Sequence, residues 1–280
     1  MIRRPRPLTS VFVHAALIVL ALVNLSPFFW LACAAFKRSD DIFNYAFVPW
    51  GHLNRLTLAN FQDLFRLEPF GQWLINSIFL SAVCTISVVT LSSLGGFALA
   101  KYRFGGKRTI MLAMLGTMLL PPQVLLGGLY ELMDRIGWIN SYLAIIVPGG
   151  VSVFGTFLFR QAMLNVPDEV LASGRIDGCG ELRLWWELAL PMVRPTVGAY
   201  TLMSFLAAWS GFLWPQIVLQ DPAKYTLPIG LNNMIGLPEY QTQYGLLMAG
   251  TLLSILPVIL LFFLVQKDFI SGLTTGAVKG

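Results

Sequence analysis

Phosphate binding is the first chemistry that the residue spacing suggests, because Gly105 and Gly106 directly precede Lys107. A nucleotide-binding loop of this kind requires a glycine five residues before the Gly-Lys pair and a serine or threonine after it. Lys101 and Arg108 occupy those two positions. The segment is therefore predicted to be a tight turn with basic residues, and any ATP hydrolysis must take place in another chain.

Metal binding is the second chemistry to consider. The candidate ligands are Cys33, Cys84, Cys179, His14 and His52. They lie far apart in the sequence and show none of the spacings typical of zinc sites or of a disulfide framework. We expect no metal site and no catalytic residue in this chain.

A stripe of small polar residues could guide a polar solute. It consists of Ser77, Ser81, Thr85, Val88 and Ser92, at spacings of 4, 4, 3 and 4 that place them on one helix face. Small residues at such spacing also allow helices to pack closely in a membrane. Both interpretations, a packing face and the lining of a solute path, remain open, and packing is favoured.

A similar stripe follows much later in the chain. It consists of Tyr200, Ser204, Ala208, Gly211 and Pro215, with Trp209 and Trp214 beside it. Aromatic rings suit the apolar faces of sugars, although tryptophan near the end of a span is also typical of the membrane interface. The candidate residues of a solute path in the two stretches are Asn76, Ser77, Ser81, Thr85, Ser204 and Trp209.

These residues belong to a very apolar chain. Of its 280 residues, 56% are hydrophobic and 12% are charged, which is typical of a multi-span membrane protein and excludes a soluble helical domain. A helix that spans a bilayer needs about 20 apolar residues. The stretches that approach or exceed this length are about Val11–Phe36, Trp73–Ala100, Ile110–Tyr130, Ser141–Phe159, Val197–Leu219 and Tyr244–Val265. We therefore predict an all-α polytopic membrane protein with six transmembrane helices.

The distribution of lysine and arginine predicts the orientation of these spans. With the N-terminus in the cytoplasm, the cytoplasmic segments hold 13 of these residues and the outer segments hold 6. Lys37 and Arg38 directly follow the first span and run against the rule, but the other connections outweigh them. Both termini are predicted to be cytoplasmic, and the basic charge reflects membrane topology, not nucleic-acid binding.

A polar segment on the predicted cytoplasmic side, residues 165–194, interrupts the apolar pattern. We call it the docking segment. Asn165 is predicted to cap a helix through Ile176, whose first turn carries acidic residues. The sequence Asp177-Gly178-Cys179-Gly180 predicts a sharp turn, because glycine adopts positive φ at little cost.

A second helix is predicted over residues 181–190, ended by Pro191 and Pro195. Its apolar face would consist of Leu182, Trp185, Trp186 and Ala189. Two uses fit this helix pair: an amphipathic float on the membrane surface, and a knob that another protein grips. The acidic start and the small residues Ala172, Ser173 and Gly174 favour the knob, because small residues let a partner approach closely.

The docking segment resembles the coupling loop of the inner-membrane permeases of binding-protein-dependent ABC importers. That loop reads Pro-x-Glu-Leu-x-Glu-Ala-Ala-x-x-Asp-Gly-Ala, with Leu-Pro about a dozen residues later. The matching residues here are Pro167, Glu169, Val170, Ala172-Ser173-Gly174, Ile176-Asp177-Gly178-Cys179 and Leu190-Pro191. Ala172 replaces the second glutamate, so the salt bridge of that residue is not expected.

The C-terminal sequence, Gly272 to Gly280, resembles the ending of the maltose-type carbohydrate permeases, the second permease chain of each importer. Further matches to that family are Asn76-Ser77, Tyr102-x-Phe104-x-Gly106, Pro121-Pro122, Trp209 and Trp214-Pro215.

The resemblance implies a single permease domain over residues 1–280 with the type I ABC importer permease fold, a coupling loop at 165–194 and a cytoplasmic tail at 266–280. It implies a bacterial inner-membrane location and import of a sugar or sugar-like solute. The implied partners are a homologous permease subunit, two ATPase subunits and an extracytoplasmic solute-binding protein, besides membrane lipid. ATP and Mg would bind to the ATPase, and this chain would hold no cofactor.

The resemblance also implies two sets of site residues. Those for coupling to the ATPase are Glu169, Ala172, Ser173, Gly174, Asp177, Gly178 and Pro191. Those for docking of the tail are Gly276, Ala277, Val278, Lys279 and Gly280.

Three alternatives remain beside a sugar importer. Importers of glycerol-phosphate esters share the same architecture. An ion-coupled secondary transporter generally carries ionisable residues at membrane depth, and the predicted spans have none near their middle except His14, near the start of the first. A membrane scaffold that transports nothing would leave the docking segment and the tail without a use.

Overall fold

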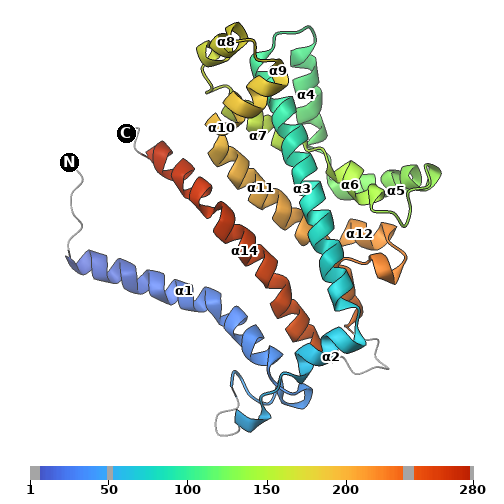
Figure 1. Ribbon diagram of the computed structural model, residues 1–280. Coiled ribbons are helices and arrows are strands. Elements are labelled where there is room, and N and C mark those ends of the chain that lie inside the picture. Colours follow the sequence, from blue (N-terminus) through green and yellow to red (C-terminus); the bar gives the residue numbers. More distant parts are fainter. Residues whose placement is uncertain (1–6, 49–52, 236–242, 278–280) are drawn as a thin grey trace. The chain divides into compact units, whose positions relative to one another are not determined.

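The computed structural model describes residues 7–48, 53–235 and 243–277, with the surroundings of side chains given for 11–48, 53–235 and 243–266. Helices account for the regular structure of these residues (Figure 1). Within the described ranges the sole extended pairing is an isolated antiparallel bridge between Lys37 and Leu56. The predicted all-α class is confirmed.

In chain order, the helices are α1 (Pro7–Ala35), η1 (Ser39–Asp41), η2 (Leu53–Arg55), α2 (Ala59–Leu67), α3 (Phe70–Lys101), α4 (Lys107–Thr117), η3 (Pro122–Leu125), α5 (Leu126–Arg135), α6 (Leu143–Gly149), α7 (Val153–Met163), α8 (Asp168–Ile176), α9 (Glu181–Arg183), η4 (Leu184–Ala189), α10 (Leu190–Met192), α11 (Arg194–Trp209), α12 (Leu213–Val218), η5 (Pro222–Lys224), α13 (Leu227–Asn233) and α14 (Tyr244–Ala277).

Among the described residues, four helical stretches are long and apolar enough to cross a membrane: Val11–Ala35, Phe70–Lys101, Leu143–Met163 and Tyr244–Gln266. A fifth span is possible if Lys107–Thr117 and Pro122–Arg135, which are bent by 94° relative to each other, count as one. All six predicted stretches are helical over most of their length, but the count of six spans is not confirmed.

The predicted span Val197–Leu219 is divided between α11 and α12. Helix α11 ends at Trp209, and Phe212 lies outside helical geometry at φ −123° and ψ −57°. Pro215 supplies a reason, since a proline ring clashes with the carbonyl group four residues earlier, here that of Gly211. An apolar sequence pattern does not reveal such a break.

The chain divides into two compact units, a first of residues 1–70 and 231–255 and a second of residues 71–230 and 256–280. Helix α14 contributes residues to both units. The single permease domain over residues 1–280 stays a prediction.

In the first unit, the end of α1 is fixed by buried polar contacts. Lys37 is fully buried, and its Nζ donates a hydrogen bond to the carbonyl oxygen of Tyr45 at 2.5 Å. The Asn60 amide donates to the carbonyl oxygens of Ala35 and Lys37 at 2.8 and 2.7 Å. Buried backbone acceptors need such donors. The lysine that runs against the charge rule therefore has a structural use.

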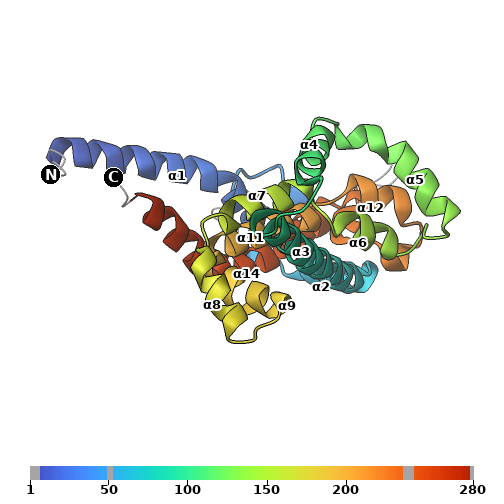
Figure 2. The ribbon, with the colours of Figure 1, turned by 90° about the horizontal axis from the view of Figure 1, so that it is seen from above.

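In the second unit, α3 packs along α7 and α11 through a buried cluster of Val88, Phe159 and Tyr200. Seen from above, α5, α6 and α12 lie on one side of α3, and α8 and α9 lie on another (Figure 2). Gly96 makes the close approach of α3 to α7 possible, because an added Cβ atom would lie 2.6 Å from Phe159 Cβ and 2.7 Å from the Arg160 nitrogen.

Replacing Gly96 with alanine is expected to lower the free energy of unfolding by about 1–3 kcal/mol, the usual cost of overpacking a core. The backbone of α7 must shift to admit the methyl group. The matched control is Gly116→Ala in α4, where an added Cβ meets nothing within 4 Å. Thermal unfolding in detergent measures both variants, and equal midpoints would contradict the close approach.

Candidate functional site

The first helix of the docking segment forms as the sequence predicts. Helix α8 runs from Asp168 to Ile176, and Gly178 has φ of +83° in the turn that follows. The predicted cap is wrong: Pro167 is the N-cap residue, and the Asn165 amide donates to the carbonyl oxygen of Gln161. Asn165 therefore extends the end of α7 instead of starting α8.

The second helix of the docking segment differs from the prediction in its register. Residues 184–189 are π-helical, and the Leu190 amide donates to the carbonyl oxygen of Trp185, five residues earlier. A π-helical turn holds more residues than an α-helical turn, so the buried face shifts. The buried residues are Leu184, Trp185 and Ala189, whereas Leu182 and Trp186, predicted to be on the apolar face, are exposed.

Pro191 does not end this helix, which continues as α10 to Met192. Helical geometry ends two residues after the proline, at Val193, which has φ −106° and ψ 21°. Pro195 stands in the first turn of α11 and starts a helix, contrary to the prediction.

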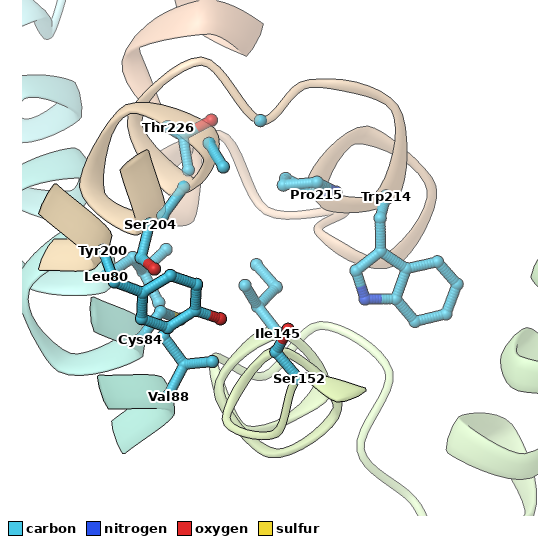
Figure 3. Close-up of a pocket in the computed structure, with 14 residues that line it drawn as sticks. Leu80, Cys84, Val88, Ile145, Ser152, Tyr200, Ser204, Trp214, Pro215 and Thr226 are labelled. Atoms are coloured by element: carbon cyan, nitrogen blue, oxygen red, sulfur yellow. The ribbon is translucent and has the colours of Figure 1, made fainter. Parts of the chain in front are cut away.

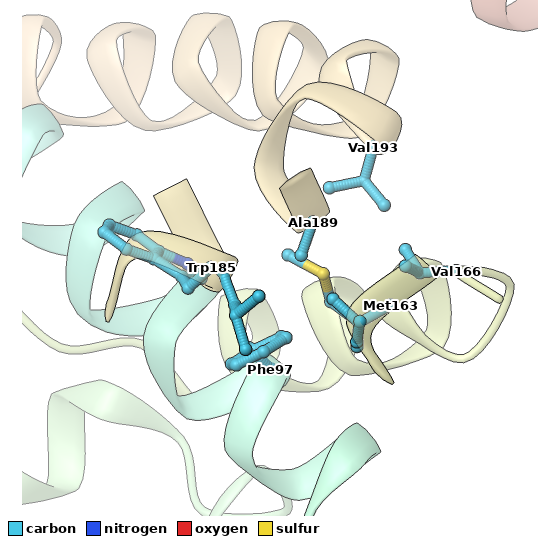
Figure 4. Close-up of a cluster of buried hydrophobic side chains, with 8 residues drawn as sticks. Phe97, Met163, Val166, Trp185, Ala189 and Val193 are labelled. Atoms are coloured by element: carbon cyan, nitrogen blue, oxygen red, sulfur yellow. The ribbon is translucent and has the colours of Figure 1, made fainter. Parts of the chain in front are cut away.

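A hydrophobic cluster fixes the docking segment to the end of the helical bundle (Figure 4). Helix α3 contributes Phe97 and α7 contributes Met163, and the docking segment contributes the rest. Those residues are Val166, Leu171, Leu184, Trp185, Ala189 and Val193. The segment therefore packs on protein, which the membrane-float interpretation does not require.

Gly174 belongs to this packed interior and not to an exposed patch. It is buried, and an added Cβ atom would lie 2.6 Å from Leu184 Cδ2 and 2.8 Å from Leu188 Cδ1. Its small size lets α8 pack on the second helix of the segment. Its neighbours Ala172 and Ser173 are exposed, as are Glu169, Asp177, Gly178 and Pro191.

Two adjacent residues at the end of α3 hold the docking segment by polar contacts. Lys101 Nζ donates to the carbonyl oxygen of Val166 at 2.5 Å and pairs with Asp168 Oδ1 at 2.7 Å. The Tyr102 hydroxyl donates to Glu181 Oε2. Burial and the Glu181 carboxylate raise the pKa of Tyr102, so this phenol stays protonated as a donor.

Glu181 is the centre of the second contact. Arg175 Nε and its terminal nitrogen donate to the two oxygens of the Glu181 carboxylate at 2.8 and 3.0 Å. Hydrogen bonds from Arg175 and then Tyr102 lower the pKa of Glu181 from 4.5 to about 2. A lowered pKa stabilises the fold above about pH 4.5, and this contribution is lost as the pH falls through about 2. The contact is therefore fully charged at neutral pH.

The small polar stripe of α3 is buried in the second unit, with Ser77, Ser81, Thr85 and Ser92 all at most 5% exposed. Ser77 Oγ accepts a hydrogen bond from the Leu227 nitrogen at 2.7 Å. The Asn76 amide donates to the carbonyl oxygens of Ala223 and Tyr225 at 2.9 Å each. Asn76 and Ser77 thus join α3 to the chain before α13, which fits the packing interpretation of this stripe.

A cavity of about 330 Å³ lies beside this stripe, between α3, α6, α11 and α12 (Figure 3). It takes in the whole later stripe, Tyr200, Ser204, Ala208, Gly211 and Pro215, together with Trp214. From α3 it is lined by Val88, a member of the stripe, and by Leu80 and Cys84, each of which stands one position before a polar residue of the stripe. None of its lining residues is charged.

Of the predicted path residues, Ser204 lines the cavity, whereas Trp209 is buried outside its lining and stacks on Phe205 at 5.7 Å between ring centroids. Thr226, which sequence reasoning missed, also lines the cavity, and its buried hydroxyl oxygen has no hydrogen-bond partner in the structure. No periodic pattern marks it, because Thr226 stands in a connection between helices.

The last apolar stretch ends at Gln266, and the predicted cytoplasmic tail that follows it is helical up to Ala277, as a continuation of α14. Gly276 and Ala277 are helical, and Val278, Lys279 and Gly280 lie outside the described residues. In the described parts of the chain, no three or more His, Cys, Asp or Glu side chains are grouped closely enough to hold a metal ion.

The long apolar helices define an integral membrane protein, with a polar helix pair packed on the end of α3. Residues 92–267 match the family of binding-protein-dependent transport system inner membrane components, and the chain belongs to this family. The match includes the whole docking segment.

Full-length relatives agree with this assignment. The chain is 34% identical over 281 residues to the arabinooligosaccharides transport system permease protein of Halalkalibacterium halodurans, covering 100% of both chains. It is 29% identical over 270 residues to the sn-glycerol-3-phosphate transport system permease protein of Yersinia pestis, covering 94% of this chain and 95% of that protein.

Among solved structures, the chain superposes on one from a bacterial ABC transporter involved in the import of the acidic polysaccharide alginate. The TM-score is 0.82 at 20% identity, over 95% of this chain and 99% of that chain. This likeness confirms the fold expected from the resemblance. Membership of this transport family argues against both other classes considered above, an ion-coupled secondary transporter and a membrane scaffold that transports nothing.

Proposed function

We propose that this chain couples ATP hydrolysis in a separate ATPase chain to solute movement through the membrane, by means of the docking segment. The observation that carries the proposal is the fixed position of α8 and α9 at the end of α3, with their outer surface exposed. A rigid element can carry a change between two conformations from one site to another if both sites, here the ATPase and the solute path, favour one of its positions over the other.

The exposed surface of the docking segment suits a protein partner. Ile176, Leu182 and Trp186 are 87%, 71% and 62% exposed. Large apolar side chains that stay exposed on a polar segment are available to contact a partner. Glu169, Ala172 and Ser173 of the same segment are exposed as well, and they add a charge and small side chains. An ATPase cleft that closes on ATP would grip this surface and move the segment.

The remaining partners follow from the family. We propose that a homologous permease subunit completes the pathway, that two ATPase subunits bind ATP and Mg, and that an extracytoplasmic binding protein delivers the solute. This chain would then be non-catalytic and hold no cofactor. Membrane lipid would surround α1, whose residues 11–29 are all exposed.

We propose a neutral oligosaccharide as the solute. The cavity offers the hydroxyl groups of Tyr200, Ser204 and Thr226 and no charge, and its volume of about 330 Å³ falls at the lower end of the range of small-molecule sites. The relative named as an arabinooligosaccharides transport system permease protein supports this choice. A glycerol-phosphate ester is the second candidate, because of the other relative, but its charge would need a cation from the partner permease.

Uptake by the reconstituted importer in proteoliposomes tests this function. Radiolabelled arabinotriose, maltotriose and sn-glycerol-3-phosphate serve as probes, each with its binding protein and internal ATP. We expect ATP-dependent uptake of a neutral oligosaccharide. Uptake of sn-glycerol-3-phosphate alone would select the second candidate, and uptake without ATP would contradict an ATP-driven importer.

The proposed location is the inner membrane of a bacterial cell, with both termini in the cytoplasm. A reporter fused after Lys107 is expected to be cytoplasmic, and one fused near Gln241 extracytoplasmic, because the charge count of 13 to 6 requires it. Paired phosphatase and fluorescent-protein fusions measure both sites. Finding the two reporters on the same side would contradict the topology.

A further inference from the structure

The contacts of Lys101 and Tyr102 have a use beyond local packing. These neighbours at the end of α3 hold two different parts of the docking segment. Lys101 holds the start of α8, and Tyr102 reaches Glu181 at the start of α9. Helix α8 has nine residues, so its ends are about 13 Å apart at 1.5 Å per residue.

Two separated contacts restrict motion in a way that one contact cannot. The hydrophobic cluster holds the buried face of α8 through Leu171, but a polar contact at Lys101 alone would leave the far end of the helix able to rotate about that point. The bond from Tyr102, passed on through Glu181 to Arg175 near the end of α8, blocks this rotation. A force applied to the outer surface of the segment then turns α3 instead of turning α8 alone.

The chemistry of the contacts suits a lasting connection. The Lys101 side chain is only 6% exposed, so its bond to the Val166 carbonyl group is shielded from water. The Arg175–Glu181 pair is bidentate, the geometry that gives charge-assisted hydrogen bonds their strength and direction. The Tyr102 ring also packs edge-on against Phe97, with centroids 5.8 Å apart.

We propose that Lys101, Tyr102, Glu181 and Arg175 form a two-point latch that makes the docking segment and α3 move as one body. These are positioning residues, which act through the docking segment and touch neither ATP nor solute. The inference rests on the proposed function, because coupling requires an ATPase that grips the segment. It adds the pathway by which the grip reaches the membrane helices.

The latch is tested by the number of solute molecules transported per ATP hydrolysed, with the oligosaccharide that the wild-type importer takes up. Tyr102→Phe removes one hydroxyl group and keeps the ring contact with Phe97. Lys101→Met removes the other point. We expect each variant to keep its ATPase through purification and to lose about two- to thirtyfold in solute per ATP, the range by which such mutations change coupling.

The double variant separates a latch from two independent bonds. With both points removed, the hydrophobic cluster alone holds α8, so the loss should exceed the product of the single losses, which is the sign of coupled residues. Lys101→Arg keeps a cation that can reach the same acceptors and should retain most of the coupling.

The matched control is Glu187→Gln. It breaks the Arg183–Glu187 ion pair, which has a similar length of 2.8 Å in the same docking segment but does not reach α3. Its coupling should equal that of the wild type.

Three results would overturn the latch. The first is normal coupling in the double variant. The second is loss of the ATPase during purification of the single variants, since the contacts would then only hold the docking surface in shape. The third is an equal loss in Glu187→Gln. A wild-type importer that shows no ATP-dependent uptake would instead overturn the proposed function, and the latch with it.

Discussion

Gly178→Val is expected to reduce docking of the ATPase at least about tenfold and to abolish uptake. Gly178 has φ of +83° between α8 and the second helix of the docking segment. A left-handed conformation costs an L-residue about 1–2 kcal/mol and a β-branched residue more, and 1.4 kcal/mol is a factor of ten in affinity. Valine would therefore reorient the two helices or unfold the turn.

Two companion variants isolate the backbone effect. An added Cβ atom meets nothing within 4 Å at Gly178 or at Gly180, so side-chain bulk within the chain is not the cause. Gly180 has φ of −70°, which alanine adopts freely, so Gly180→Ala should retain docking. Gly178→Asn should fall between them, because asparagine tolerates positive φ. Co-purification of the ATPase and uptake measure all three, and wild-type values in Gly178→Val would contradict the role of the turn.

Filling the cavity gives the second large effect. Ala208→Phe places a ring in the cavity of about 330 Å³ and is expected to lower uptake more than about tenfold, a barrier increase of 1.36 kcal/mol. Ala208 lies near the far end of α11 from the docking segment, about 21 Å along the helix at 1.5 Å per residue, so the ATPase should still bind. Measured uptake and ATPase retention therefore separate a blocked path from a lost partner.

The control for this substitution is Ala113→Phe, at an exposed position of α4. It adds the same ring to the same kind of residue outside the cavity and should leave uptake unchanged. Normal uptake in Ala208→Phe would remove the cavity from the solute path. A complex that no longer assembles would show that Ala208 serves packing alone.

Local sequence signals predicted α8 correctly. The acidic residues at its start interact favourably with the helix dipole, and Gly178 after its end adopts positive φ. Both effects act within one helix or one turn, so they can be read directly from the sequence. The second helix was predicted in the wrong register, because the π-helical residues 184–189 shift the buried face by a fraction of a turn. Leu182 and Trp186 were therefore predicted to be buried, although both are exposed.

Contacts between distant parts of the chain could not be predicted. Tyr102 and Glu181 are 79 residues apart and meet only because α7 brings the docking segment back to the end of α3. The stripe from Tyr200 to Pro215 was visible in the sequence and does line the cavity. Spacing in the sequence could not decide whether Trp209 or Trp214 lines the cavity, because both residues lie near the break between α11 and α12.

Photocrosslinking from Ser173 tests the central claim most directly. Ser173 is exposed on α8, and a photoreactive phenylalanine there probes whatever binds the docking segment in intact cells. Leu17, which is 56% exposed on α1, provides the control position. We predict a crosslink to the ATPase subunit, identified by mass spectrometry, from Ser173 and none from Leu17. No ATPase adduct from Ser173, or an equal yield from both positions, would contradict coupling through the docking segment.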